Sequence, residues 1–236
     1  MEWFLQSFWG QIGVFFAGGL ITLLTGVLTK NVSIRKSGIK KIYTEGKSIK
    51  SMERKMRNSK TIRVLAVTAH HFLHGYRELL TEHIINGGDV DILLSSPLSE
   101  YIEDVSRIEN RGDDAVKISL KQAVGIIDAI QRDADIEAAK TNRRAGKICL
   151  RFYRSEMRNS MIICVDNSNN ESAWMSIVMP PRVASQCKMI EYSDAGDCIH
   201  TFNAIWNLYA NDTKNLEIKS ALLAEASTGS VVGTER

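Results

Sequence analysis

Three of the five histidines in this chain of 236 residues, His70, His71 and His74, lie within five positions of the stretch VTAHHFLHGY. An imidazole can act as a general base, bind a metal ion or contact an anionic ligand near neutral pH. If a helix begins here, His70 and His74 share one face at the i and i+4 spacing that can hold a metal. A third metal ligand would have to come from elsewhere in the chain, with Asp166, His83 and His200 as candidates.

The same cluster also fits a strand exit in which Phe72 and Tyr76 pack as aromatic residues. Three interpretations of the histidine cluster therefore stay open: a structural role, contact with a ligand or partner, and metal binding. We expect no metal site, and His70 and His74 are the candidates if one exists. The chain lacks a Gly-x-Gly-x-x-Gly or Walker loop, a Gly-x-Ser-x-Gly elbow and a His-Glu-x-x-His helix. We therefore expect no cofactor and none of the common hydrolase sites.

A second candidate ligand site lies in RFYR, where Arg151, Tyr153 and Arg154 combine positive charge with an aromatic ring. Arginine binds phosphate oxygens through two parallel hydrogen bonds, so this segment can hold a phosphate-bearing ligand. The alternative is that these are solvated charges around an edge strand.

The apolar pattern predicts the elements that position these residues. TIRVLAV at residues 61–67 and VDILLSS at residues 90–96 are β-rich runs, and YRELLTEHIING between them has helical spacing. Strand, helix and strand over this length predict a βαβ unit with parallel strands. Ligands bind at the carboxyl ends of such strands, and the histidine segment follows the first strand. Three further strands are expected between residues 147 and 179, and a closing helix over residues 194–210.

RFYRSEMRNSMIICVDNSNNESAWMSIVM, from Arg151 to Met179, resembles the core of a phospholipase D-like half-domain, in which one strand carries His-x-Lys-x4-Asp. Aligned on Asp166, the histidine position falls on Asn159 and the lysine position on Met161. The segment SKTIRVLAVTAHHFLHGYRELLTEHIINGGDVDILLSSP is similar to the first strand, helix and second strand of that superfamily. CIHTFNAIWNLYA resembles its C-terminal helix. The resemblance covers roughly residues 40 to 212.

This resemblance implies an α/β fold, a phospholipase D-like mixed sheet flanked by helices. In catalytic members the histidine attacks phosphorus and the lysine neutralises phosphate oxygens. Asn159 is a poor nucleophile and Met161 carries no charge, so the resemblance implies a protein without phosphodiesterase activity. Members with a single motif commonly dimerise, so a homodimer or higher homo-oligomer is expected. Asp166 alone matches the motif, and it also fits a turn.

Phe8 to Leu28 is a run of 21 residues without a charged side chain, a length that spans a bilayer core as a helix. Twelve basic and two acidic residues follow between Lys30 and Arg63. The positive-inside rule then predicts a single-pass inner-membrane protein of bacterial type, with its N-terminus outside and its C-terminal domain in the cytoplasm. Gly18, Thr22 and Gly26 share one helix face and favour self-association.

The predicted organisation has four parts: a transmembrane segment at 1–29, a basic juxtamembrane helix or linker at 30–60, a phospholipase D-like domain at 61–212 and a flexible tail at 213–236. The predicted function is a membrane-anchored, non-catalytic sensor or effector that binds a phosphate-bearing ligand or protein partner and signals through self-association, in bacterial stress or antiphage defence. A residual metal-dependent hydrolase and a structural membrane scaffold are the alternatives. Nucleic acid is not an expected partner, because the basic excess is confined to the segment before Val64.

Overall fold

The structure, a computed structural model, describes residues 38–43, 50–108, 114–157, 159–177, 188–192, 194–212 and 214–229. The chain divides into two compact units, residues 1–40 and residues 41–236, and every described element except the start of β1 belongs to the second. In chain order the described elements are β1 (Ile39–Tyr43), α2 (Lys50–Arg57), β2 (Ser59–Ala66), α3 (His70–Gly75), α4 (Arg77–Ile85), β3 (Asp89–Ser95), α5 (Tyr101–Ile108), α6 (Ala115–Lys140), β4 (Ile148–Tyr153), β5 (Asn159–Asp166), β6 (Glu171–Ile177), β7 (Met189–Tyr192), α7 (Gly196–Leu208) and α8 (Lys214–Gly229).

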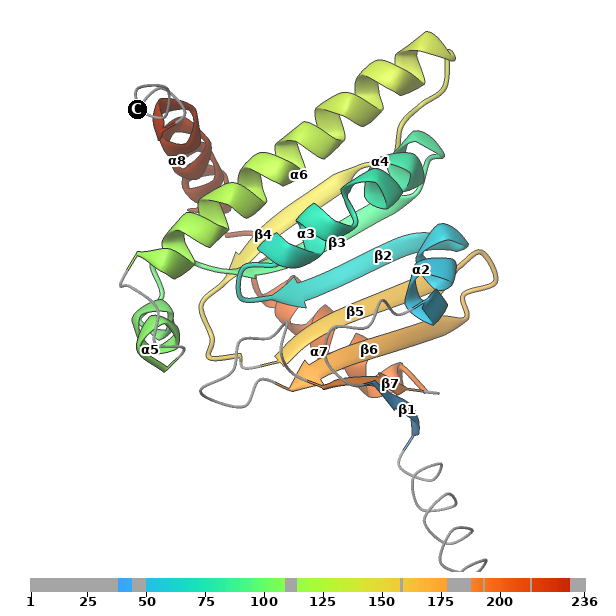
Figure 1. The fold of residues 1–236 in the computed structure, drawn as a ribbon, viewed down its shortest axis with the longest axis horizontal. Helices are drawn as coiled ribbons and strands as arrows, with labels where there is room; N and C mark the ends of the chain where they lie inside the picture. Colours follow the sequence, from blue (N-terminus) through green and yellow to red (C-terminus); the bar gives the residue numbers. More distant parts are fainter. Residues whose placement is uncertain are drawn as a thin grey trace, which may run out of the picture. The chain divides into compact units, whose positions relative to one another are not determined.

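The strands form one mixed sheet in the order β1-β7-β6-β5-β2-β3-β4 (Figure 1). β2, β3 and β4 are parallel, whereas β5 is antiparallel to β2 and β6 is antiparallel to both β5 and β7. The expected βαβ unit is confirmed, since β2 and β3 pair in parallel with α3 and α4 between them. Residues 64–66 and 92–94 are all buried, as expected of strands covered on both faces.

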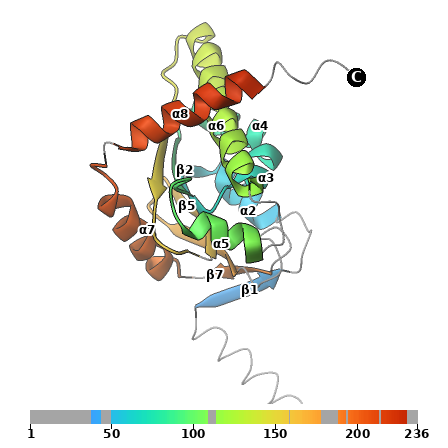
Figure 2. The ribbon, with the colours of Figure 1, turned by 90° about the vertical axis from the view of Figure 1, so that its left-hand side faces the viewer.

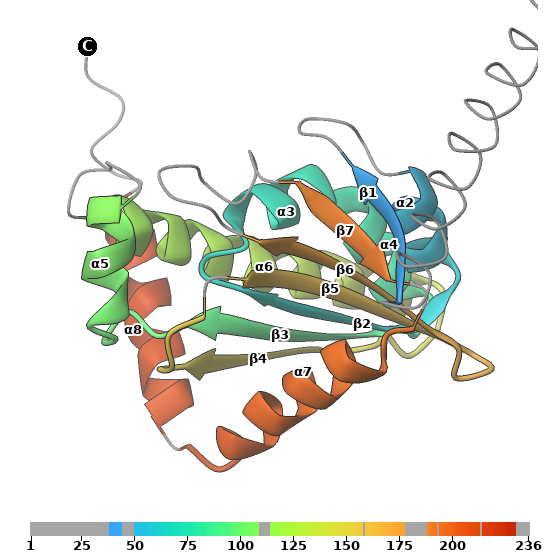
Figure 3. The same ribbon diagram turned by 90° about the horizontal axis from the view of Figure 1, so that it is seen from below.

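Helices cover both faces of the sheet. Figures 2 and 3 show α2, α3, α4 and α6 on one face and α7 on the other. The α6-side core contains residues such as Ile62, Ile92 and Phe152, and the α7-side core contains Leu65, Leu93 and their neighbours. Neighbouring residues of one strand enter different cores because side chains alternate between the faces of a sheet. Each large apolar side chain buried in this way stabilises the fold by about 1.5–3 kcal/mol.

Side chains from helical regions occupy part of the outer edge of β4. Gln131 Oε1 accepts a hydrogen bond from the Ile148 backbone nitrogen at 2.7 Å. Asn215 Oδ1 accepts one from the Phe152 nitrogen at 3.0 Å. An open strand edge offers free backbone groups to another chain, and filling them with side chains removes that template. Self-association of this protein through the β4 edge is therefore not favoured.

The predicted single-pass membrane architecture needs correction. The apolar run at residues 8–28, including Gly18, Thr22 and Gly26, lies outside the described residues. Within the described ranges no helix combines the length and the apolar character needed to cross a bilayer. The longest, α6, has 26 residues but carries charges such as Lys121, Asp128 and Arg132. This finding contradicts the transmembrane part of the predicted fold class and the inner-membrane location, and the fold class becomes a mixed α/β sheet with flanking helices.

Two further segments differ from expectation. A basic helix or linker was expected over residues 30–60, and within that range the structure describes strand β1 and helix α2, which buries Met52 and Met56. The segment expected to be a flexible tail contains α8, which buries Ile218 and Leu222 in the α6-side core. Local polarity hides α8, because only a few of its apolar side chains reach the core.

Candidate functional site

The carboxyl ends of β2, β3 and β4 lie at one edge of the sheet, called here the carboxyl edge. β2 is followed by the histidine segment, β3 ends at Ser95, and β4 ends at Tyr153 beside Arg154. β5 begins at this edge with Asn159, because it runs antiparallel to β2 and pairs Met161 with Leu65. α/β sheets bind their ligands outside the carboxyl ends of parallel strands, so this edge is the candidate site.

The three histidines cluster on α3 at the carboxyl edge. The His70 ring lies 5.3 Å from the His71 ring and 6.2 Å from the His74 ring, between centroids. Partial burial, followed by the charges of His71 and His74, lowers the pKa of His70. The helix follows Ala69, which adopts a left-handed conformation with φ 53°. His70 is therefore held as a neutral imidazole near pH 7, available as a hydrogen-bond donor and acceptor.

The structure does not add a third ligand to these histidines. His83 is buried on α4, with its Nε2 3.3 Å from the carbonyl oxygen of Asp89 at the start of β3. His200 lies on α7, on the other face of the sheet. Among the described residues, no group of three or more His, Cys, Asp and Glu side chains could hold a metal ion.

The positions of the phospholipase D-like motif are spread along β5. Met161 is 3% exposed and packs in the α7-side core. Asp166 lies at the opposite end of the strand, opposite Ser59. Asn159 and Asp166 lie seven positions apart along the strand, a distance of roughly 24 Å. The motif residue that matches the family therefore does not reach the carboxyl edge.

Asp166 shapes a turn after β5. Its Oδ1 accepts hydrogen bonds of 2.8 Å from the backbone nitrogens of Ser168 and Asn170. Its Oδ2 accepts a 3.0 Å bond from Asn170 Nδ2. These donors, chiefly the Asn170 side chain, lower the pKa of Asp166 and keep it ionised. Both carboxylate oxygens are thus used within the turn.

Arg151 and Arg154 point to different surroundings. The Arg151 guanidinium lies 3.9 Å from the centroid of the Trp206 ring and donates a 2.7 Å hydrogen bond to the Trp206 carbonyl oxygen. It therefore ties β4 to α7 rather than contributing to the carboxyl edge. Arg154 lies at that edge, and its guanidinium forms an ion pair with Asp212 at 3.2 Å.

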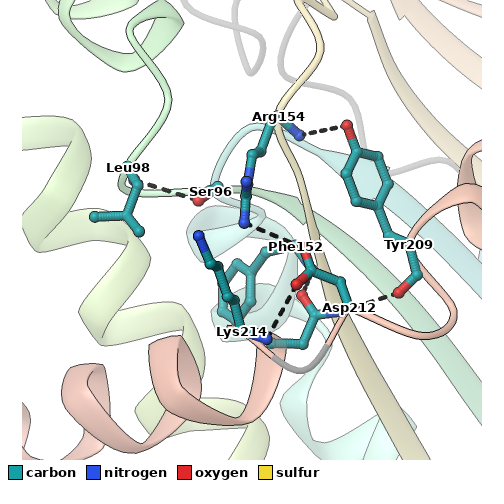
Figure 4. Close-up of polar contacts among 8 residues, drawn as sticks. Ser96, Leu98, Phe152, Arg154, Tyr209, Asp212 and Lys214 are labelled. Carbon is teal, nitrogen blue, oxygen red and sulfur yellow. Dashed lines mark hydrogen bonds and ion pairs between the residues drawn. The ribbon is translucent and has the colours of Figure 1, made fainter.

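Figure 4 shows the surroundings of Arg154, whose side chain extends between Ser96 and Asp212. Its backbone nitrogen donates to the Tyr209 hydroxyl at 3.1 Å, and its carbonyl oxygen accepts from the Ser99 hydroxyl at 3.2 Å. Asp212 also accepts a 3.0 Å bond from the Lys214 backbone nitrogen. The loop after α7 and the loop after β3 thus hold Arg154 from both sides, while its side chain stays partly exposed to solvent.

Tyr153, which the sequence analysis proposed as a ligand residue, is buried at this edge, and its pairing there with the Ser95 hydroxyl was not predicted. Ser95 and Tyr153 are paired residues of neighbouring parallel strands, and both are fully buried. Neither hydroxyl has a hydrogen-bond partner of normal geometry among the described residues. Burial raises the pKa of Tyr153 and keeps the phenol protonated. The sequence does show a hydroxyl-bearing residue at the end of each of these two strands. That the two hydroxyl groups are neighbours follows only from the register between β3 and β4.

Comparisons with known proteins add little to this geometry. No protein-family model and no curated protein matches the sequence. One solved structure that the comparison found is that of TrmBL2, an archaeal chromatin protein whose structure is described as showing a novel mode of DNA binding. The two chains are 12% identical, and the match covers 88% of this chain and 68% of the other with a TM-score of 0.41. A likeness of this size carries no argument about function, and it leaves the phospholipase D-like resemblance untested.

Proposed function

We propose that this chain is a non-catalytic, phospholipase D-like binding module of bacterial type, which recognises a ligand or a protein partner at the carboxyl edge and signals through self-association. The observation that carries the proposal is the state of the motif positions on β5. The nucleophile position is Asn159, the phosphate-neutralising position is the buried Met161, and Asp166 lies at the other end of the strand. The setting that we propose is stress or antiphage signalling.

The geometry supports binding rather than hydrolysis because the groups that surround the carboxyl edge are recognition groups. His71 and His74 are exposed, Arg154 keeps part of its guanidinium free, and Leu98 is 70% exposed. A neutral His70 and an arginine already paired with Asp212 give this edge little net charge. A partner that combines apolar and hydrogen-bonding groups fits it best.

The occupied positions of the β4 edge constrain how the protein self-associates. Three outward N–H groups at this edge, those of Ile148, Phe152 and Arg154, have side-chain partners. We therefore place self-association on a surface other than this strand. A dimer that uses the carboxyl edge itself would couple ligand binding to assembly, because the ligand and the second copy would meet the same residues.

Hydrolysis of bis(p-nitrophenyl) phosphate tests the non-catalytic part of the proposal. The purified chain should show no turnover above buffer, with or without Mg²⁺ or Zn²⁺. An Asn159→Ala variant serves as the matched control, because it removes the side chain at the nucleophile position without touching the core. Turnover that the wild type shows and Asn159→Ala lacks would contradict the proposal.

Light scattering coupled to size exclusion tests the self-association. The wild type should form a dimer or larger species whose population rises with concentration. An Arg154→Ala variant should change that equilibrium if the carboxyl edge takes part. A wild type that stays monomeric at every accessible concentration would refute self-association, and unchanged assembly in Arg154→Ala would place the interface elsewhere.

A further inference from the structure

The ends at which β2, β3 and β4 begin form the edge of the sheet opposite the candidate site, called here the amino edge. A hollow of about 330 Å³ opens there. Its lining consists of Arg54, Lys55, Asn58, Cys164, Asp166 and Asn170. These residues come from the last turn of α2, the residue after it, the end of β5 and the turn that follows β5. The hollow therefore forms only when α2 packs against the sheet beside β5.

Packing and turn geometry both build the hollow. Met52 and Met56 bury one face of α2 in the core that also contains Cys164, which leaves Arg54 at the surface. Asp166 organises the opposite wall, because its carboxylate binds the backbone and side chain of Asn170. Cys164 forms the floor, and burial raises the pKa of its thiol to about 12. The floor is therefore uncharged, and the charge of the hollow comes from its walls.

Within the described residues the cations of the hollow form no salt bridge, although the charge of Lys55 helps to lower the pKa of Asp166 in the opposite wall. Arg54 and Lys55 form no ion pair with any residue that the structure describes, whereas Arg57 on the same helix pairs with Glu82. The single carboxylate in the lining, Asp166, already accepts three hydrogen bonds within its turn. Two cations and two side-chain amides facing one hollow can neutralise an anion and donate hydrogen bonds to its oxygens.

We propose that this hollow binds the phosphate group of a small phosphorylated ligand, held by Arg54 and Lys55 with Asn58 and Asn170 as hydrogen-bond donors. Its volume lies at the lower end of the range of about 300–1,000 Å³ for small-molecule sites, which suits a phosphate with a short attached group. Asp166 then acts as a positioning residue, because its turn places Asn170. The site lies beyond the proposed function, at the other end of β5 from Asn159.

The position of the cations has a competing explanation. Carbonyl groups at a helix C-terminus carry partial negative charge, and basic residues in the last turn of α2 complement it. That role applies to Arg57 as well as to Arg54 and Lys55. Arg57 shares this helix-end position but does not line the hollow, so Arg57 is the control for the general effect of charge at this end of α2.

Isothermal titration of the full chain with pyrophosphate and with ADP tests the site. Measurements at about 50 mM salt screen the charge interactions less than physiological salt does. In Arg54→Gln/Lys55→Gln the dissociation constant should rise by at least about tenfold, because two charge-assisted interactions are lost. In Arg57→Gln it should change by less than about twofold. Thermal unfolding of each variant shows whether the fold is intact, and Asn170→Ala gives a second test of the opposite wall.

Three outcomes overturn the proposal. The first is unchanged affinity in the folded double variant, and the second is an equal loss in Arg57→Gln, which would show a general charge effect. The third is binding of a short oligothymidylate without binding of pyrophosphate or ADP, which would make α2 a nucleic-acid surface instead. Each result concerns the amino edge alone, so none of them bears on ligand recognition at the carboxyl edge.

Discussion

Gly146→Ala should destabilise this protein strongly, because two loops cross at Gly146 without room for a side chain. A Cβ on Gly146 would lie 1.9 Å from the carbonyl oxygen of Gly88 and 2.7 Å from its carbonyl carbon. The Gly146 backbone nitrogen also donates a 2.8 Å hydrogen bond to the Ile84 carbonyl oxygen. Both loops lead directly into strands β3 and β4, so a shift in either disturbs the start of their pairing.

The size of the effect follows from this contact. Both clashing groups are backbone, so no flexible side chain can move aside. Overpacking of this kind costs about 1–3 kcal/mol, and weakening the bond to Ile84 adds about 1 kcal/mol. We expect a loss of about 3 kcal/mol in the free energy of unfolding, a large share of the roughly 5–15 kcal/mol of a typical domain. The melting temperature should fall by about 6–12 °C.

Urea unfolding, followed by far-UV circular dichroism and by tryptophan fluorescence, to which the buried Trp174 contributes, measures this loss. Gly125→Ala is the matched control. Gly125 lies inside α6, and no described atom other than its own helix backbone and chain neighbours lies within 4 Å of a Cβ added there. Alanine should stabilise the helix by up to about 1 kcal/mol. The two substitutions therefore have opposite signs, and a Gly146→Ala variant as stable as the wild type would refute the reasoning.

Three further predictions concern the carboxyl edge and the β4 edge. Tyr153→Phe should leave the free energy of unfolding within about 1 kcal/mol of wild type or raise it, because the lost hydroxyl has no partner of normal geometry among the described residues. A loss above about 2 kcal/mol, measured by urea unfolding, would contradict this prediction. Because the pKa of His70 is lowered in the folded chain, the unfolded chain takes up a proton first as the pH falls through about 6.5, and the stability of the fold declines there. His70→Gln should flatten this decline in melting temperatures recorded between about pH 7 and pH 5. The same dependence of melting temperature on pH in wild type and variant would disprove the prediction. Asn215→Ala should free the Phe152 N–H and add a concentration-dependent species in light scattering, whereas wild-type behaviour would show that the Asn215 side chain does not protect the edge.

The residues of the candidate site were partly predictable. The position of the histidines at the exit of the first parallel strand follows from local patterns, because an apolar strand, a helix and a second apolar strand allow one usual crossover. Arg154 was predicted as a ligand residue, and it lies at the carboxyl edge. Arg151 carried the same prediction, but its contacts depend on Trp206, 55 residues further along the chain.

The sequence by itself determined the residue types at the motif positions and the parallel pairing of β2 and β3, since both depend on local order along the chain. Only the tertiary structure decided which of these residues meet. Because β5 runs antiparallel to β2, it places Asn159 at the carboxyl edge and Asp166 at the opposite edge. The side chains at the outer edge of β4 and at the hollow beside α2 likewise come from segments far apart in sequence. These groups meet only because helices and strands pack together, and a local sequence pattern does not show which distant segments will be neighbours in the fold.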